Sequence, residues 1–523
     1  MTEVAEGDAN PAGVGGLLAD ARRSFAAPRP GAGLISVIDI GSNSVRMVVF
    51  EGGLRSPSVV FNEKDMCGLG TNLLETGALS PEGRVATLAT LRRFAAQAES
   101  MKVDGLAAVA TAAMRDATDG RAFRDEIEAK TGIRAQITTG EEEARLAGSG
   151  VLFGNPDASG VTADLGGASM ELARVGGGSV RSGLSTPLGP LRLSALAARG
   201  GDVDATIRGY LDTLSPELTE AVDTLYLVGG AWRALARVSM ARSDYPLPVL
   251  HEYSLDRDTA RSLALWVKNQ SREKLLAFPG IASARAATMP YAARILPALL
   301  DRLSPRSVSI SAFGLREGVV FDIMAPQIRL RDPLLAACEE QERRRARLPG
   351  FGAELGDFLL RLMPEEAGEE RLIRALAYLA DVNWRTHPDY RVTGCWETVT
   401  RANLSDLGHR GRALMGAALA MRYKRGRKAA DPGGALRLVS EADQQRAMRI
   451  GLALRLGSAL AGSSPGILGD VSVVRDKKAV SLFLSGRARE MAGAEVVKRL
   501  TQFARALDLE PMLSTTNGPG ASA

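Results

Sequence analysis

Two segments of this chain carry the same arrangement of residue types that could bind an anion. Residues 37–50 read VIDIGSNSVRMVVF, and residues 162–175 read TADLGGASMELARV. Each begins as an apolar, strand-forming run that ends in an aspartate, and a glycine-rich turn with a serine at the same place leads into a second apolar run. This repeat predicts two β-hairpins whose turns face each other across a cleft and clamp phosphate between them.

The two turns consist of small residues that let the backbone approach an anion. Glycine allows a tight turn, which we expect at positive φ. Successive amide N–H groups together with a hydroxyl form a concavity that suits phosphate oxygens. The predicted phosphate-binding residues are Gly41, Ser42, Asn43 and Ser44 in the first turn, and Gly166, Gly167, Ala168 and Ser169 in the second.

Charged residues flank both turns at equivalent positions. Asp39 and Asp164 precede the turns, where a carboxylate would repel phosphate unless a divalent cation such as Mg²⁺ lay between them. Arg46 follows the first turn and is a candidate phosphate fork. Glu171 follows the second and is expected to hold Mg²⁺ with Asp164 or to orient a water. The alternatives are two hairpins that bind nothing and, for Glu171, an exposed strand carboxylate.

Composition limits the class of protein. The chain has 523 residues, of which 45% are hydrophobic and 24% charged, as expected for a globular protein of about three domains. No apolar run is long enough to span a bilayer, no secretory signal is evident, and the three cysteines have no metal-binding spacing. We therefore expect a cytoplasmic protein with reduced cysteines and neither a membrane nor a nucleic acid as partner. The net charge of +5 is compatible with other polyanions.

Residue periodicity and turn signals predict an α/β fold up to about residue 330 and a helical region after it. Predicted helices in the first part follow Ser80-Pro81 and run over 120–132, from Glu141, over 204–224 and over 315–324. Predicted strands cover 106–110, 133–139, 179–185, 225–228 and 307–311. In the second part, helices extend to about residue 460, followed by a hairpin over 469–485, a helix over 492–507 and a frayed end from Ser514.

Seven motifs, in chain order, resemble the exopolyphosphatase and guanosine pentaphosphate phosphohydrolase family, within the actin, sugar kinase and Hsp70 superfamily. They are DIGSNSVRMVV at Asp39, ATAAMRDA at Ala110, TGEEEARLAGSGV at Thr139, DLGGASMEL at Asp164, STPLGPLRL at Ser185, VGGAWRALA at Val228 and SAFGLREGVV at Ser311. One departure is Ala168, where the family usually has a third glycine.

The resemblance implies two actin-like, ribonuclease H-like lobes with a cleft between them, and a mainly helical, HD-like C-terminal domain that ends in α+β structure. The expected organisation is a tail over 1–32, lobe I over 33–155, lobe II over 156–330, the helical domain over 331–512 and a tail over 513–523. The chain contains no His-Asp dipeptide, so we expect no separate HD metal site. The resemblance also implies a homodimer.

Glu143 is the expected catalytic base. It lies near the start of a predicted helix beside Glu141 and Glu142, and crowding by like charges raises the pKa of a carboxyl. By resemblance Glu143 corresponds to the glutamate that activates water and Arg115 to a phosphate ligand. Glu171, one pleat beyond Ser169, is expected to be a second catalytic carboxylate. The alternative for all three glutamates is an ordinary acidic helix start.

The function implied is Mg²⁺-dependent, processive removal of terminal orthophosphate from inorganic polyphosphate. Hydrolysis of guanosine pentaphosphate to the tetraphosphate is the second candidate, and a sugar-kinase-like phosphotransferase or a non-catalytic sensor are the others. Two features stay ambiguous. Gly229-Gly230-Ala231 could hold adenosine or only lead into a helix. The basic runs at Arg343, Arg344, Arg345 and Arg347 and at Arg422, Lys424, Arg425, Arg427 and Lys428 could bind a polyanion or form solvated faces.

Overall fold

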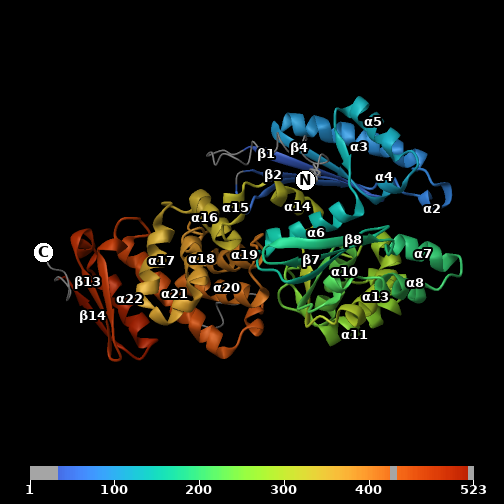
Figure 1. The fold of residues 1–523 in the computed structure, drawn as a ribbon. Helices are drawn as coiled ribbons and strands as arrows, with labels where there is room; N and C mark the ends of the chain where they lie inside the picture. Colours follow the sequence, from blue (N-terminus) through green and yellow to red (C-terminus); the bar gives the residue numbers. More distant parts are fainter. Residues whose placement is uncertain (1–32, 53, 424–432, 516–523) are drawn as a thin grey trace, which may run out of the picture. The chain divides into compact units, whose positions relative to one another are not determined.

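The structure is a computed structural model that describes residues 33–52, 54–423 and 433–515 (Figure 1). The described residues form two compact units. The first contains the described chain up to Asp244 together with Leu250–Leu330, and the second contains Tyr245–Val249 together with the described chain from Arg331. The predicted tail over 1–32, most of the predicted tail over 513–523, and Lys424, Arg425, Arg427 and Lys428 of the second basic run lie outside the described residues.

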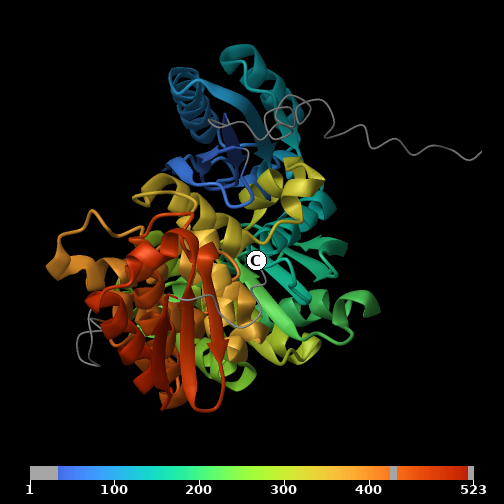
Figure 2. The ribbon, with the colours of Figure 1, turned by 90° about the vertical axis from the view of Figure 1, so that its left-hand side faces the viewer.

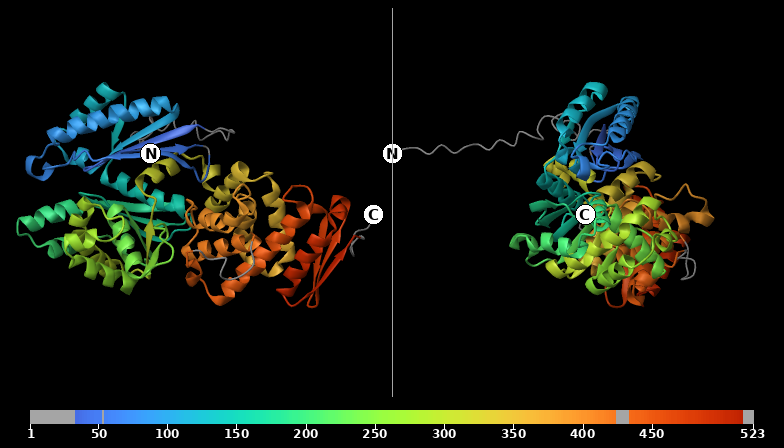
Figure 3. Two further views of the ribbon diagram at one scale, coloured as in Figure 1. Left: turned by 180° about the vertical axis from the view of Figure 1, so that it is seen from behind. Right: turned by 90° about the vertical axis from the view of Figure 1, so that its right-hand side faces the viewer.

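Lobe I of the first unit is built on a five-stranded sheet with the strand order β3-β2-β1-β4-β5. Helices α3 and α5 lie together on one face of this sheet, as the views in Figures 1 and 3 agree. Helix α3 begins as predicted, because Ser80 accepts a hydrogen bond from the Gly83 amide and Pro81 occupies the first turn. The elements are β1 (Leu34–Ile40), β2 (Val45–Glu51), β3 (Val59–Asp65), α2 (Leu73–Thr76), α3 (Pro81–Ser100), β4 (Val103–Ala110), α4 (Ala112–Asp116), α5 (Gly120–Thr131) and β5 (Ala135–Ile137).

Lobe II is built on a six-stranded sheet with the order β10-β11-β9-β6-β7-β8. Both sheets mix antiparallel hairpins with parallel neighbours, which confirms the predicted α/β class. Its strands are β6 (Gly160–Leu165), β7 (Met170–Gly176), β8 (Ser179–Thr186), β9 (Thr224–Val228), β10 (Ser254–Asp256) and β11 (Ser307–Ser311). The helices are α6 (Gly140–Gly154), α7 (Pro190–Ala198), α8 (Val203–Asp212), α9 (Pro216–Thr219), α10 (Gly230–Arg242), α11 (Arg257–Lys268), α12 (Arg272–Leu276), α13 (Ser283–Leu303), α14 (Leu315–Ile323) and α15 (Pro326–Arg329).

The two predicted hairpins have the same internal geometry. Asp39 is paired with Arg46 across the first hairpin, and Asp164 is paired with Glu171 across the second. In each turn a glycine amide donates to a serine carbonyl at 3.0 Å, from Gly41 to Ser44 and from Gly166 to Ser169. The expected positive φ is wrong, because none of the turn glycines adopts it. Small size matters here for another reason: a Cβ on Gly41 would lie 3.3 Å from the Ser44 carbonyl oxygen.

Helices α6 and α14 connect the two sheets through an unusually close backbone contact. Helix α6 packs on β7 and β8 and against α14, which also contacts β1. A Cβ on Gly318 of α14 would lie only 1.8 Å from the Leu146 carbonyl oxygen of α6, and a Cβ on Gly150 would lie 2.1 Å from the Gly314 carbonyl oxygen. Glycine at these positions therefore lets α6, which carries Glu143, lie directly against α14.

The second unit is helical and ends in a small sheet, as predicted, with a core formed largely by its long helices. Figure 2 shows the strands β12, β13 and β14 side by side. The helical segments are α16 (Pro333–Arg345), α17 (Phe351–Leu362), η1 (Pro364–Glu369), α18 (Glu370–Leu379), η2 (Pro388–Tyr390), α19 (Arg391–Thr400), α20 (His409–Tyr423), η4 (Ala435–Leu438), α21 (Glu441–Ala461), η5 (Leu468–Asp470), η6 (Gly486–Met491) and α22 (Ala494–Arg505). The strands are β12 (Val471–Arg475), β13 (Ala479–Leu484) and β14 (Glu510–Ser514).

Three predicted elements differ from the structure. The helix over 204–224 is wrong: α8 ends at Asp212 and α9 starts at Pro216, because proline disfavours a helical residue before it. The strand over 133–139 is shorter, as Ala135–Ile137. Ser514 is not frayed, since it ends β14, which pairs in parallel with β13. Pro511 argues against a strand in the sequence, but β14 lies at the edge of its sheet, where proline is tolerated.

We expect Gly318→Ala to destabilise the first unit by about 1–3 kcal/mol, the usual cost of overpacking, because the new methyl group meets a backbone carbonyl that cannot rotate away. Urea unfolding, followed by circular dichroism, measures the effect. Gly209→Ala is the matched control. Gly209 lies within α8 with open space at its Cβ position, so this change should raise stability slightly. Equal stability of the two variants would contradict the close α6–α14 contact.

Candidate active site

A cleft of about 620 Å³ lies in the first unit and is lined by both hairpin turns. The side chains from lobe I and lobe II therefore meet as the sequence predicts. Of the predicted site residues, the cleft is lined by Asp39, Gly41, Ser42, Asn43, Ser44, Arg46, Glu143, Asp164, Gly166, Gly167, Ala168, Ser169 and Glu171. Arg115 is not among the lining residues.

Glu143 is buried in the first turn of α6, and burial is the main reason that its pKa is raised, to about 7. The charges of Asp164 and Asp39 raise it further, whereas Arg115, whose Nη1 donates to Glu143 Oε2 at 2.8 Å, lowers it. The predicted cause of this shift was wrong. Glu141 is exposed, and Glu142 closes a capping box with Thr139, so neither neighbour contributes as expected.

Glu171 is also buried, with only 2% of its surface exposed, which excludes the alternative of an exposed strand carboxylate. Burial raises its pKa, and the charges of Glu143 and Asp164 act in the same direction. The hydroxyl of Ser185 donates to Glu171 Oε1 at 2.8 Å, and the Ser169 hydroxyl also bonds to this carboxylate. These two hydroxyls fix the orientation of Glu171 beside the second turn.

Asp39 and Asp164 interact with each other across the cleft. Burial raises the pKa of both, to about 6 for Asp164, and the charge of Asp39 contributes to that value. A cation between them would relieve this repulsion, which fits the predicted Mg²⁺. Among the described residues, no three histidine, cysteine, aspartate or glutamate side chains converge as metal ligands. Two carboxylates are nevertheless sufficient for Mg²⁺ when phosphate oxygens and waters complete its shell.

Four cationic side chains in the cleft were not predicted as site residues. They are Lys64, Arg233, Arg285 and Arg316, and with Arg46 they place five positive charges in one cavity. Burial and mutual repulsion lower the pKa of Arg46 to about 10 and also lower those of Arg233, Arg285 and Lys64. Arg316 lies 3.8 Å from Asp39, and its Nε is buried without a hydrogen-bond partner in the described part of the chain.

Some of these cations could have been found from the sequence. Arg233 and Arg316 lie inside motifs quoted above, VGGAWRALA and SAFGLREGVV. Lys64 lies on β3 and Arg285 on α13, and no local pattern marks either of them. Only the folded lobes bring these two residues together.

Comparison with known proteins identifies the family. Residues 47–327 match the Ppx/GppA phosphatase family, and residues 334–509 match the exopolyphosphatase C-terminal domain. The chain belongs to the Ppx/GppA phosphatase family. It is therefore a hydrolase of this family, and its C-terminal region is of the exopolyphosphatase type.

Individual relatives cover the first unit. Exopolyphosphatase 1 of Mycobacterium tuberculosis is 27% identical over 304 residues, 55% of this chain and 87% of that protein. The guanosine-5'-triphosphate,3'-diphosphate pyrophosphatase of Aliivibrio fischeri is 27% identical over 306 residues, 56% of this chain and 59% of that protein. The crystal structure of an exopolyphosphatase from Cytophaga hutchinsonii, 23% identical, has a TM-score of 0.50 over 56% of this chain and 97% of that one, which shows a shared fold.

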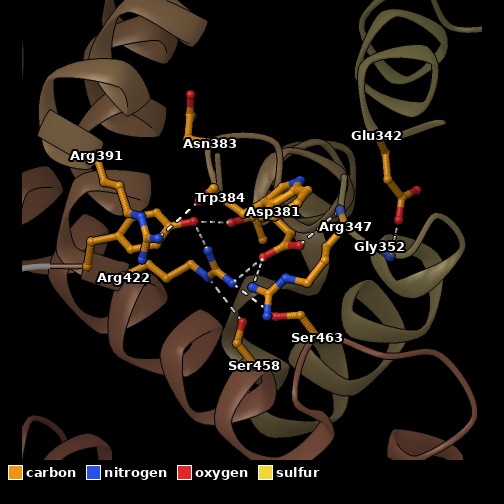
Figure 4. Close-up of polar contacts among 12 residues, drawn as sticks. Glu342, Arg347, Gly352, Asp381, Asn383, Trp384, Arg391, Arg422, Ser458 and Ser463 are labelled. Carbon is orange, nitrogen blue, oxygen red and sulfur yellow. Dashed lines mark hydrogen bonds and ion pairs between the residues drawn. The ribbon is translucent and has the colours of Figure 1, made fainter. Parts of the chain in front are cut away.

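The described members of the two C-terminal basic runs of this Ppx/GppA protein differ in burial. Arg422 is buried and pairs with Asp381 at 3.2 Å, and its Nε donates to Ser458 at 3.1 Å (Figure 4). Arg347 pairs with the same aspartate at 3.1 Å. Arg343 and Arg344 pair with Glu340 on the same helix. Arg422 therefore has a structural role, and the first run remains a candidate for either a solvated face or a polyanion contact.

Across the described residues, no helix is long and apolar enough to cross a membrane.

The turn at Gly229 leads into α10, and it also lines the cleft. Gly229 adopts φ 109°, and a Cβ there would lie 2.6 Å from the Leu165 carbonyl oxygen. The guanidinium of Arg285 covers the neighbouring residue, because a Cβ on Gly230 would lie 2.6 Å from Arg285 Nη2. Whether this loop also holds adenosine stays a hypothesis.

We expect Arg115→Met to move the acid limb of the pH–rate profile to higher pH. A general base acts only when it is deprotonated, so activity falls as the pH drops below the pKa of Glu143. Arg115 lowers that pKa, and its removal should raise it. The measurement is kcat/KM for phosphate release against pH. Arg124→Met, which changes an exposed arginine paired with Asp125, should leave the profile in place. A limb that stays fixed in Arg115→Met contradicts the assignment.

Proposed function

We propose that this protein is an exopolyphosphatase that processively removes terminal orthophosphate from inorganic polyphosphate. The observation that carries the proposal is the charge of the cleft, where five cationic side chains line one cavity. Burial, and to a lesser extent repulsion between them, lowers several of their pKa values, and a bound polyanion would remove the repulsion. No aromatic side chain is among the cleft-lining residues that the structure describes, so the site offers no stacking surface for a base.

In the proposed reaction, the two hairpin turns bind the terminal phosphate through their backbone amides, including that of Ser169, and through the Ser44 hydroxyl. Glu143 accepts a proton from the attacking water, since its raised pKa suits a base near neutral pH. Glu171, oriented by Ser185 and Ser169, holds that water in line with the scissile bond. The shortened chain leaves towards the arginines, which stabilise the negative charge on its new end.

Asp39 and Asp164 would hold Mg²⁺ together with phosphate oxygens of the substrate and waters. Glu171 was also predicted as a metal ligand, but the described residues do not bring three such ligands together, so we assign it to the water. When bound, Mg²⁺ neutralises charge on the transferring phosphoryl group. Its presence would also remove the repulsion that now raises the pKa of Asp164. We further propose that the protein is cytoplasmic. We also propose that it forms a homodimer, and light scattering of the purified protein would test this oligomeric state.

Guanosine pentaphosphate is the second candidate substrate, because the relative from Aliivibrio fischeri bears the name of that activity. Its phosphates would satisfy the same turns and cations. The absence of an aromatic platform among the described lining residues and the position of Arg285 on Gly230 favour the polyphosphate chain.

The deciding experiment compares phosphate release by the purified protein from long-chain polyphosphate and from guanosine pentaphosphate. We expect a higher kcat/KM for polyphosphate. Activity on the nucleotide alone would reverse the order of the two candidates. A requirement for a sugar hydroxyl as acceptor would support a kinase-like phosphotransferase, and binding of polyphosphate without any turnover would support a sensor.

Glu143→Gln should lower kcat by on the order of 10²–10⁴, the usual loss for a general base, while polyphosphate binding survives. Glutamine keeps the size and the hydrogen bond to Arg115 but cannot take the proton. Steady-state kinetics and equilibrium binding measure the two effects. The control is Glu141→Gln, which changes an exposed glutamate two residues earlier in the chain and should keep full activity. Loss of binding in Glu143→Gln would indicate a structural role instead.

Chelation with EDTA should abolish activity, and added Mg²⁺ should restore it, because the carboxylates of Asp39 and Asp164 repel phosphate without a cation between them. Phosphate release after dialysis against EDTA, with and without Mg²⁺, tests this. Asp164→Asn should raise the Mg²⁺ concentration needed for half-maximal activity. Full activity of the dialysed protein without metal would rule out the metal assignment.

A further inference from the structure

A second cationic pocket lies in the first unit, outside the cleft. It has a volume of about 310 Å³ and is formed largely by helices α11, α12 and α13. Lys268, Arg272 and Arg294 line it together with the phenol of Tyr291, and no aspartate or glutamate is among its described lining residues. A pocket with this lining attracts anions, and phosphate above all, because arginine and lysine donate several hydrogen bonds to phosphate oxygens.

One carboxylate behind the pocket holds two of these cations in place. Asp204 of α8 pairs with Lys268 at 3.3 Å and with Arg294 at 3.0 Å. The side chains of Lys268 and Arg294 remain 27% and 33% exposed, so their free donors can reach a ligand. Arg272 bonds instead to the Ser283 hydroxyl at the start of α13. Three positive charges thus face one negative charge, and the pocket keeps a net positive charge.

Helix α13 joins this pocket to the active-site cleft. Arg285 and Thr288 of α13 line the cleft, while Ala287 and Arg294 line the pocket. The helix surface between the two sites is formed by small exposed residues. They are Ala282, Ser283, Ala284 and Ala287, and the Arg272 side chain reaches this surface through its hydrogen bond to the Ser283 hydroxyl. At 1.5 Å per residue, Arg285 and Arg294 lie roughly 14 Å apart along the helix.

We infer that the pocket of Lys268, Arg272 and Arg294 is an exosite that binds phosphates of the substrate chain farther from the end being hydrolysed. The inference rests on the proposed function of the cleft. A chain that leaves the cleft past Arg285 can cross the low surface of α13 and enter the pocket. A substrate of three phosphates is too short to occupy both sites, so the exosite would make the enzyme prefer long chains.

The test compares the double variant Arg272→Ala/Arg294→Ala with the control Arg257→Ala/Arg306→Ala. The control also removes two exposed lobe II arginines, each near one aspartate, but neither lines the pocket. First, KM is measured for long-chain polyphosphate and for tripolyphosphate. We expect the ratio of the two KM values to rise about tenfold in the exosite variant and to stay at the wild-type value in the control.

Second, binding of long-chain polyphosphate is measured in the Glu143→Gln background, where turnover does not interfere. The exosite variant should bind more weakly, and the slope of log Kd against log salt should fall by about 1–2, since two fewer phosphates are neutralised. This arm tests the exosite even if the wild-type enzyme proves to hydrolyse a different phosphoanhydride. Failure of the wild type on polyphosphate would therefore count against the proposed function and not against the exosite.

Three results would overturn the inference. An equal rise of KM for both chain lengths would indicate a general loss of the fold or of the cleft, which thermal melting of both double variants would show. Unchanged binding and an unchanged KM ratio would indicate that the pocket does not touch the chain. If added orthophosphate alters tripolyphosphate hydrolysis by the wild type but not by the exosite variant, the pocket is a site for a small anion and not for the chain.

Discussion

The active site depends on keeping like charges together in one partly buried cavity. Four carboxylates and five cations line the cleft, and direct pairing among them is incomplete, because Arg316 approaches Asp39 only to 3.8 Å. Burial raises the pKa of every one of these carboxylates and lowers that of several cations. A metal ion would relieve the repulsion among the carboxylates and a polyanion would relieve that among the cations, so the charge pattern of the cleft is complementary to a metal–phosphate complex.

The repulsion between these buried charges requires a scaffold that holds the side chains in place. The hairpins of the two lobes have matching backbone turns. The residue across the strand pair from the aspartate differs in charge, because Asp39 faces Arg46 whereas Asp164 faces Glu171. Helix α6 brings Glu143 between them, and the glycine contact with α14 fixes the position of α6. The duplicated lobes are therefore similar in backbone geometry but different in charge. Both lobes contribute cations to the cleft, with Arg46 and Lys64 from lobe I and Arg233, Arg285 and Arg316 from lobe II.

The pKa of Glu143 illustrates why local sequence is a poor guide to electrostatics. Its neighbours Glu141 and Glu142 suggested crowding by like charge, yet one is exposed and the other caps the helix with Thr139. The raised value comes from burial and from Asp164 and Asp39, which are distant in the chain. The direction of the pKa shift of Glu143 was predictable from the residue types, whereas its cause became clear only from the fold. The same holds for Arg115, which ion-pairs with Glu143.

The sequence by itself determined the two hairpins, their turn residues, the flanking acids and the α/β class, because these depend on short-range patterns of glycine, apolar residues and turn chemistry. The break between α8 and α9 follows from a local rule, because Pro216 disfavours a helical residue before it. The sequence could not predict that Pro511 lies in β14, because the edge position of this strand is set by the folded sheet. Nor could it place Lys64 and Arg285 in the cleft, or Arg422 in a buried pair with Asp381. Burial and charge proximity are set by segments that meet only after folding, so tertiary structure alone decided which cations face the cleft and which support the scaffold.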